Sequence, residues 1–291
     1  MSRALGLDVG GTNIKLAVLE DGVLAATDSA ATLSDHGGPQ AVLERVVALG
    51  RAAGPVDSIG VALPGLLDVE GNAVILPNLH GDWPGRPIRA PLEAGFDRPV
   101  PLINDGHAFA LAEARIGAAR GSRDVICIVC GTGVGGGLVL GGELHFGVGD
   151  RAGEVGHHTV VPDGLLCACG NHGCLETVAG ARAIAREAGK VSFDDVVAAA
   201  RAGEGGAISA LERAGAFIGI AIANLTIFVT PERVVVGGGV AEAGPLLLDP
   251  IRAEVERRAA NVAPLDRIEI VPAELGPWAG AIGAALWGAE S

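Results

Sequence analysis

A cluster of cysteines stands out in a chain that is poor in sulfur. Cys167, Cys169 and Cys174 form a C-x-C-x4-C pattern, and only two other cysteines occur in the 291 residues. Three thiolates and one imidazole suit a structural zinc ion in tetrahedral coordination. An odd cysteine count does not favour a disulfide framework. The residues therefore predict one structural zinc. Three histidines lie close enough in sequence to supply the fourth ligand: His157, His158 and His172.

Two glycine-rich turns are candidates for phosphate binding. They read "DVGGT" (8–12) and "CGTGVGGG" (130–137). Successive backbone N–H groups in such turns can converge on an anion, and threonine hydroxyls add donors. Either turn alone could be a plain hairpin turn, but the two together suggest two loops that bind one polyphosphate group. Residues 131–136 also match G-x-G-x-x-G, yet a strand-like segment follows, so a dinucleotide-binding fold is rejected.

Asn104 and Asp105 stand where a predicted strand ends and a predicted helix begins. Both residue types cap helices well, so capping is one interpretation. The carboxyl ends of strands in α/β folds also face ligand crevices, which favours a site.

The elements that must position these residues alternate between strands and helices. Residues 4–29 read as three strands joined by tight turns, and residues 124–146 repeat that layout about 120 residues later. Such a repeat predicts two α/β lobes built on one plan, with a boundary near residue 115. A helix is expected over 105–119, and a packed helix closes the sequence.

Charge and hydropathy exclude several classes of protein. The net charge is −13 and no basic run occurs, which excludes a nucleic-acid partner. The longest apolar run (214–229) is shorter than the roughly 20 residues that span a bilayer, so a buried helix is expected. The start of the sequence does not read as a signal peptide. We expect a cytoplasmic protein without a membrane partner.

Several of these motifs together resemble the ROK family of sugar kinases and repressors. "LDVGGTNIK" is similar to its N-terminal phosphate loop, "GTGVGGG" to its second glycine motif, and "EVGHH" with "CACGNHGCLE" to its E-x-G-H and C-x-C-G-x-x-G-C-x-E signatures. The resemblance implies a bilobal actin/hexokinase-like (ribonuclease H-like) α/β fold with an active-site cleft between the lobes. It implies an N-terminal lobe of 1–115 joined by a helix over 277–291, and a larger lobe of 116–276.

The resemblance also assigns roles to residues. It makes Asp105 the general base and selects His157 as the zinc ligand, with its second ring nitrogen directed at a sugar hydroxyl. The expected zinc ligands are His157, Cys167, Cys169 and Cys174. The expected sugar contacts are Gly65, Asn78, Asn104, Asp105, Glu154, His157 and Glu176. The expected ATP and magnesium contacts are Asp8, Gly10, Gly11, Thr12, Gly131, Thr132, Gly133, Gly238 and Gly239. The zinc loop would then shape the sugar site and take no part in the chemistry.

The activity implied is ATP-dependent phosphorylation of a hexose. "PNLHGDW" is most similar to the glucokinase-like branch, which favours glucose and its 6-phosphate. N-acetylmannosamine, N-acetylglucosamine and fructose kinases share the same motifs, and polyphosphate could replace ATP as donor. A non-catalytic sugar-sensing protein of the family is a further alternative. A repressor is disfavoured because Asp8 leaves no room for a preceding helix-turn-helix. Mg-ATP, one structural zinc and a homodimer or higher homo-oligomer complete the expectation.

Overall fold

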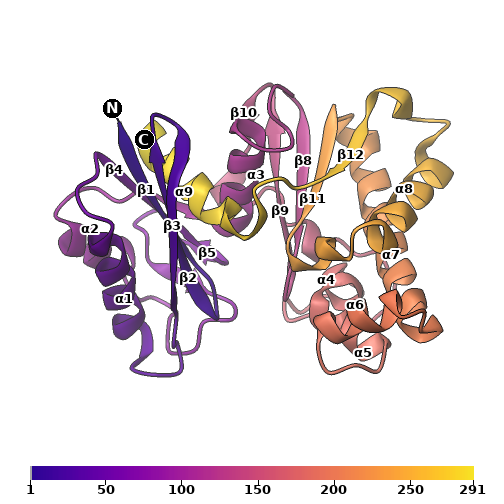
Figure 1. Cartoon of the computed structure of the whole chain (residues 1–291), viewed down its shortest axis with the longest axis horizontal. Coiled ribbons are helices and arrows are strands. Elements are labelled where there is room, and N and C mark those ends of the chain that lie inside the picture. The colour runs from indigo at the N-terminus through magenta and orange to yellow at the C-terminus, as the bar shows by residue number, and fades with distance from the viewer. Residues whose placement is uncertain (1) are drawn as a thin grey trace. The chain divides into compact units, whose positions relative to one another are not determined.

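A computed structural model describes residues 2–291, and the chain divides into two compact units. Unit 1 comprises the residues up to Glu113, Phe146–Ala152 and Pro277–Ser291, and unit 2 comprises Ala114–His145 and Gly153–Gly276 (Figure 1). The chain therefore passes between the units four times. The lobe boundaries expected above, 1–115 and 116–276, stay a prediction.

Unit 1 is built on a five-stranded sheet with the order β3-β2-β1-β4-β7. Strands β1, β2 and β3 are antiparallel neighbours, whereas β4 and β7 add in parallel on the other side of β1. Its strands are β1 (Arg3–Val9), β2 (Asn13–Glu20), β3 (Val23–Ala31), β4 (Ser58–Leu63) and β7 (Leu102–Asn104), with a separate small hairpin of β5 (Leu66–Leu67) and β6 (Ala73–Ile75). Its helices are α1 (Gly38–Ala52), α2 (Arg89–Phe96), α3 (Asp105–Arg115, whose last two residues belong to unit 2) and α9 (Ala279–Glu290), and a short 3₁₀ turn, η1, covers Val148–Asp150.

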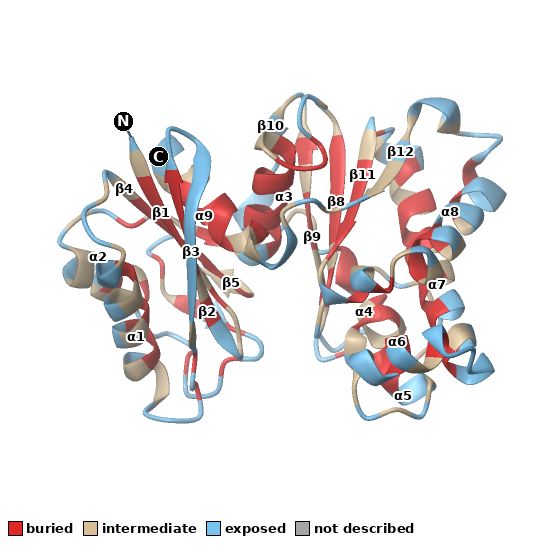
Figure 2. Cartoon of the chain, in the orientation of Figure 1, coloured by how far each residue is buried: buried red, intermediate tan, exposed pale blue. Residues whose placement is uncertain are grey.

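Glycines on the sheet of unit 1 let helix α9 approach the strands very closely. A Cβ atom on Gly6 of β1 would lie 1.8 Å from the Ala281 carbonyl oxygen, and one on Gly60 of β4 would lie 1.9 Å from the Ala284 carbonyl oxygen. Side chains alternate along a strand, so Leu7 on the same strand points to the opposite face, where Gly50 of α1 packs. The sheet is thus covered on both faces at β1, and β1, β2 and β4 supply many of the buried residues of unit 1, whereas the edge strand β3 is exposed (Figure 2).

Unit 2 repeats the topology of unit 1. Its sheet has the order β10-β9-β8-β11-β12, again with three antiparallel strands followed by two parallel additions. The strands are β8 (Val125–Cys130), β9 (Val134–Leu140), β10 (Glu143–Leu144), β11 (Arg233–Gly237) and β12 (Glu269–Pro272). The repeat read from the sequence is therefore a repeat of fold, and the predicted α/β class is confirmed.

The helices of unit 2 pack on one another and on the sheet. They are α4 (Glu176–Ala179), α5 (Ala181–Glu187), α6 (Phe193–Arg201), α7 (Gly205–Val229) and α8 (Pro245–Ala259). Short 3₁₀ turns cover Val155–His157 (η2), Gly239–Ala243 (η3) and Leu265–Arg267 (η4), and a fifth, η5 (Gly276–Trp278), leads into α9. Among residues 2–291, α7 alone is long and apolar enough to cross a membrane, but its middle lies in the core of unit 2 against α8. Most of the apolar run therefore lies in a core helix, as expected, whereas Ile227 and Phe228 near its end are exposed.

The sequence and the structure differ in the details of unit 1. The helix expected over 105–119 ends at Arg115 and continues as turns. The hairpin β5–β6 and helix α2 were not predicted from the sequence, because their apolar runs are too short to give a clear period.

Candidate active site

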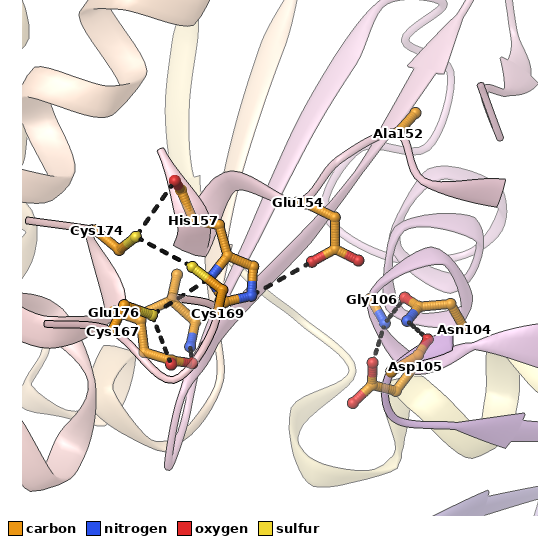
Figure 3. Close-up of polar contacts among 12 residues, drawn as sticks. Asn104, Asp105, Gly106, Ala152, Glu154, His157, Cys167, Cys169, Cys174 and Glu176 are labelled. Atoms are coloured by element: carbon orange, nitrogen blue, oxygen red, sulfur yellow. Dashed lines mark hydrogen bonds and ion pairs between the residues drawn. The ribbon is translucent and has the colours of Figure 1, made fainter. Parts of the chain in front are cut away.

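The four predicted zinc ligands converge in unit 2. The ligand atoms of His157, Cys167, Cys169 and Cys174 all lie within 4.8 Å of one another (Figure 3). The Cys167 Sγ is 3.6 Å from the His157 Nδ1, and the Cys169 Sγ is 3.7 Å from the Cys174 Sγ. A tetrahedral zinc with ordinary bond lengths would give ligand edges of about 3.6 Å (S to N) and about 3.8 Å (S to S). The residues present therefore fit zinc.

Burial of the thiols gives a second reason why a cation suits this cluster. Burial raises the pKa of Cys174 to about 12 and also raises the pKa of Cys167. The pKa of Cys169 is lowered, mainly by the backbone N–H of Asn171. Because two of the three neighbouring thiols resist ionisation, the cluster does not readily form three thiolates by itself. A bound divalent cation would stabilise all three thiolates.

The imidazole of His157 separates the cluster from a carboxylate. Its Nδ1 faces the sulfurs, whereas its Nε2 lies 4.0 Å from the Glu154 Oε2 (Figure 3). A histidine bound to a metal through one nitrogen is fixed in orientation and keeps the other for a hydrogen bond. Nε2 and the exposed Glu154 carboxylate can thus face a polar ligand together.

Glu176 begins helix α4 and joins the cysteine loop to the second glycine turn. Its Oε2 accepts a hydrogen bond of 3.2 Å from the Val134 N–H, and its Oε1 lies 3.9 Å from the Cys167 Sγ. A Cβ atom on Gly133 would lie 2.1 Å from the Glu176 Oε2. The predicted sugar residue Glu176 is therefore also in contact with the predicted phosphate turn.

The second glycine turn is held from both sides. The Gly131 N–H donates to the Gly133 carbonyl, and the Ala181 N–H donates to the Gly131 carbonyl, each at 2.8 Å. Thr132 at the tip is exposed. Gly238 has a φ of +82°, and a Cβ atom there would lie 2.3 Å from the Cys130 carbonyl oxygen. The predicted nucleotide residues of unit 2, namely Gly131, Thr132, Gly133, Gly238 and Gly239, therefore gather where β8 and β11 end.

In unit 1, Asn104 is a helix cap. Its Oδ1 accepts hydrogen bonds from the N–H groups of Gly106 (2.8 Å) and His107 (3.2 Å), and its Nδ2 donates to the Gly65 carbonyl at 3.1 Å (Figure 3). The capping interpretation is thus correct, and the same bonds bring the predicted sugar residues Gly65 and Asn104 together.

Asp105 follows as the first residue of α3. Its side chain is exposed, and its Oδ1 accepts the Gly106 N–H at 2.8 Å. The N-terminus of a helix stabilises a negative charge, so this position favours the carboxylate. An exposed, anionic carboxylate at the carboxyl end of a strand can accept a proton from a ligand hydroxyl.

The first glycine turn lies against Asn78. A Cβ atom on Gly11 would lie 2.6 Å from the Asn78 carbonyl oxygen, and Asn78 itself has a φ of +65°, which asparagine tolerates well. The Gly10 N–H donates to the Asn13 carbonyl at 3.0 Å, which closes the turn, and Thr12 is exposed.

Asp8, the penultimate residue of β1, is a desolvated carboxyl group. Burial raises the pKa of Asp8 to about 6, although the charge of Lys15, its cross-strand neighbour, acts in the opposite direction. A Cβ atom on Gly280 would lie 2.6 Å from the Asp8 Oδ2, so helix α9 covers the group. A carboxylate in this position suits a hydrated divalent cation, which would hold it in the ionised form.

A buried histidine next to the predicted base was missed. His107 is 1% exposed, its Nε2 lies 2.8 Å from the Ala152 carbonyl oxygen, and its ring meets Phe146 edge-on at 5.3 Å. Phe146 in turn lies 5.2 Å from Trp287. These rings line a cavity of about 190 Å³ together with Gly65 and Asn104. The "NDGHA" motif contained the histidine, but nothing in the sequence pointed to its partners.

A larger cavity of about 380 Å³ lies in unit 2 between the zinc loop and helices α4, α5 and α7. None of the predicted site residues lines it. Its rim carries the ion pair of Arg213 with Glu187, whose N–O distance is 2.9 Å.

Comparisons with known proteins show which chains this one is similar to. The sequence profile of the ROK family matches residues 4–290. The glucokinase of Streptomyces coelicolor is 32% identical over 98% of this chain and 97% of its own length, and that of Halalkalibacterium halodurans is 36% identical over 96% and 92%. The crystal structure of a ROK family glucokinase from Streptomyces griseus in complex with glucose and AMPPNP superposes with a TM-score of 0.88 at 32% identity, with full coverage of both chains.

Proposed function

This chain belongs to the ROK family, and on that premise we propose that it is an ATP-dependent kinase that converts glucose to glucose 6-phosphate. The proposal depends chiefly on one observation: Asp105 presents an exposed carboxylate at the end of β7, stabilised by the start of α3. The relatives named above are glucokinases, which favours glucose over other hexoses.

The acceptor chemistry would use the predicted sugar residues. Gly65, Asn78 and Asn104 of unit 1, and Glu154, His157 and Glu176 of unit 2, would bind the sugar hydroxyls. The Asp105 carboxylate would accept the proton of the attacking hydroxyl as its oxygen forms a bond to the γ-phosphorus. The bond from that phosphorus to the bridging oxygen breaks at the same time, and ADP leaves.

The donor chemistry is electrostatic. The transferring phosphoryl group carries dispersed negative charge, so backbone N–H groups and hydroxyls that are already in place lower the barrier. We assign this role to Gly10, Gly11 and Thr12 in unit 1 and to Gly131, Thr132 and Gly133 in unit 2. Gly238 and Gly239 would let the adenosine lie against the backbone. Asp8 would hold the magnesium ion through water, and magnesium would neutralise the phosphate oxygens.

Zinc would be structural in this enzyme. Four protein ligands leave no open coordination position, so the metal would not activate water. Its role would be to fix His157, and with it the neighbouring carboxylate of Glu154, in the orientation that the sugar requires.

A coupled assay of ADP release tests the proposal. The purified protein is offered glucose, fructose, mannose, N-acetylglucosamine, N-acetylmannosamine and kanosamine, with ATP or polyphosphate as donor. We expect the highest kcat/KM with glucose and ATP, and phosphorus NMR should show the phosphate on the 6-oxygen. A clear preference for an amino sugar or for polyphosphate would reassign the substrate or donor, and no turnover with any pair would contradict the proposal.

We further propose that the enzyme is cytoplasmic and acts as a homodimer or higher homo-oligomer. Light scattering of the purified protein measures the second point directly. A mass of one 29.1 kDa chain at micromolar concentration would contradict it.

A further inference from the structure

Glu176 contacts the predicted phosphate turn, although the family resemblance assigned this residue to the sugar. We propose that Glu176 is a positioning residue for the second glycine turn, through which the cysteine loop supports nucleotide binding. This inference rests on the proposed kinase function and adds a coupling between the zinc loop and the phosphate turn.

The first argument is the geometry at the turn. The Glu176 Oε2 accepts the Val134 N–H at 3.2 Å, directly after the turn formed by residues 131–133. The turn leaves no room for a side chain at Gly133, because a Cβ atom there would lie 2.1 Å from the Glu176 Oε2. The carboxylate therefore lies directly against the turn, and its position fixes where β9 begins.

The second argument concerns the other oxygen of the Glu176 carboxylate. The Glu176 Oε1 lies 3.9 Å from the Cys167 Sγ, which is one of the four converging ligand atoms. Glu176 is also only two residues after Cys174. A change in the cysteine cluster would therefore move both the backbone and the carboxylate of Glu176.

The third argument is that helix α4 contacts the turn at its far end as well. The Ala181 N–H, just beyond α4, donates to the Gly131 carbonyl at 2.8 Å, and a Cβ atom on Gly180 would lie 2.9 Å from the Thr132 carbonyl oxygen. The phosphate turn is thus held at both ends by the segment that follows the cysteines. Loss of the cluster should loosen the turn even when sugar is absent.

Glu154 provides a matched control. It is the other predicted sugar carboxylate of unit 2, but its described polar contact is with His157 and not with the turn. Glu154→Ala should weaken glucose binding and leave nucleotide binding unchanged. Glu187→Gln, on the exposed ion pair with Arg213, should change neither.

The test measures binding of Mg-AMPPNP by calorimetry in the absence of sugar, glucose binding separately, and the KM for ATP at saturating glucose. Glu176→Ala should raise the nucleotide Kd and the KM for ATP about tenfold, as expected for the loss of a hydrogen bond to a charged acceptor. Protein stripped of zinc by a chelator, and shown to be folded by circular dichroism, should show a nucleotide Kd raised in the same direction. A change confined to glucose binding in Glu176→Ala would overturn the proposal while leaving the kinase assignment intact.

A second variant probes the contact from the turn itself. Gly133→Ala places a methyl group against the Glu176 carboxylate, so it should also raise the nucleotide Kd. In the double variant with Glu176→Ala the methyl group has room, and the combined loss should be clearly smaller than the product of the two single losses. Losses that multiply would show that the two residues act independently and would overturn the proposal.

Discussion

Replacing Asp105 by asparagine tests the centre of the proposed mechanism. The carboxamide has nearly the shape of the carboxylate and keeps an oxygen that can accept the Gly106 N–H, which now lies 2.8 Å from the Asp105 Oδ1. It cannot accept a proton at neutral pH. The exchange therefore removes the chemistry and preserves the hydrogen bond at the start of helix α3.

The magnitudes of the two effects are far apart. Loss of the negative charge at a helix N-terminus costs about 0.3–1 kcal/mol of stability. Loss of a general base costs about 10²–10⁴ in rate, which is about 3–5 kcal/mol in the activation barrier. Asn104 keeps its own two bonds to the helix N-terminus, so the start of α3 stays capped in the variant. We expect a folded protein with a kcat lowered at least a hundredfold.

The assay is ADP release at saturating glucose and ATP, with the glucose Kd measured by calorimetry without ATP. The Kd should change by less than about threefold, because the sugar is held by many groups. Asp97→Asn is the matched control: Asp97 is also an exposed aspartate of unit 1, in a left-handed conformation (φ 56°) that asparagine accepts. A folded Asp105→Asn protein with a kcat close to that of the wild type would remove Asp105 from the role of base.

Three further predictions concern metal content, pH dependence and packing. Cys169→Ser should lose zinc, as measured by elemental analysis, and its KM for glucose should rise at least tenfold. Cys127→Ala, on strand β8 outside the loop, should keep its zinc. Full zinc content in Cys169→Ser with an unchanged KM for glucose would refute the ligand set. The pKa of Asp8 is raised to about 6, so the folded protein binds this proton more tightly than the unfolded chain, and the stabilisation by Asp8 is present at low pH and lost as the pH rises through about 6. Asp8→Asn should therefore raise the free energy of unfolding in magnesium-free buffer by up to about 3 kcal/mol at pH 8, by about half as much at pH 5 and by little at pH 4. A pH-independent difference in urea titrations would contradict the assignment. Gly6→Ala should lower the free energy of unfolding by about 3 kcal/mol, because the new Cβ atom meets the backbone of α9. Gly205→Ala, whose Cβ atom would point into open space, should not lower it. Equal melting temperatures for the two variants would contradict this packing.

The zinc set could be predicted because its members are close in sequence. Four ligands fall within eighteen residues, so their spacing alone limits the geometry that the loop can adopt. Choosing His157 over His158 and His172 needed the family resemblance, and in the structure His157 is the histidine of the cluster. The repeated strand pattern was also local, and it predicted two α/β lobes built on one plan; in the structure the two sheets have equivalent strand orders.

The contacts that were missed join residues far apart in sequence. Glu176 meets Val134 across 42 positions, and His107 meets Ala152 across 45. Neither pair has a periodic or spacing signal, since such contacts depend on how whole elements pack. The membership of Phe146–Ala152 in unit 1 is hidden for the same reason: seven residues with only one short 3₁₀ turn give no indication of the unit they join. The roles of the predicted sugar and nucleotide residues stay predictions until the variants above are measured.

The docking of α9 on the first strands has a consequence for biosynthesis. A nascent chain emerges from the ribosome with its N-terminus first. Strands β1 and β4 therefore lack the helix that covers them until residues 279–290 have left the exit tunnel. All of unit 2 has been translated by then, because it ends at Gly276. Most of unit 1 is therefore synthesised first, yet unit 1 is the last of the two units to receive all of its elements. During this interval the apolar face of the nascent sheet stays exposed, so we expect ribosome-associated chaperones to engage ribosome-bound chains that stop before α9 and to release them once that helix emerges.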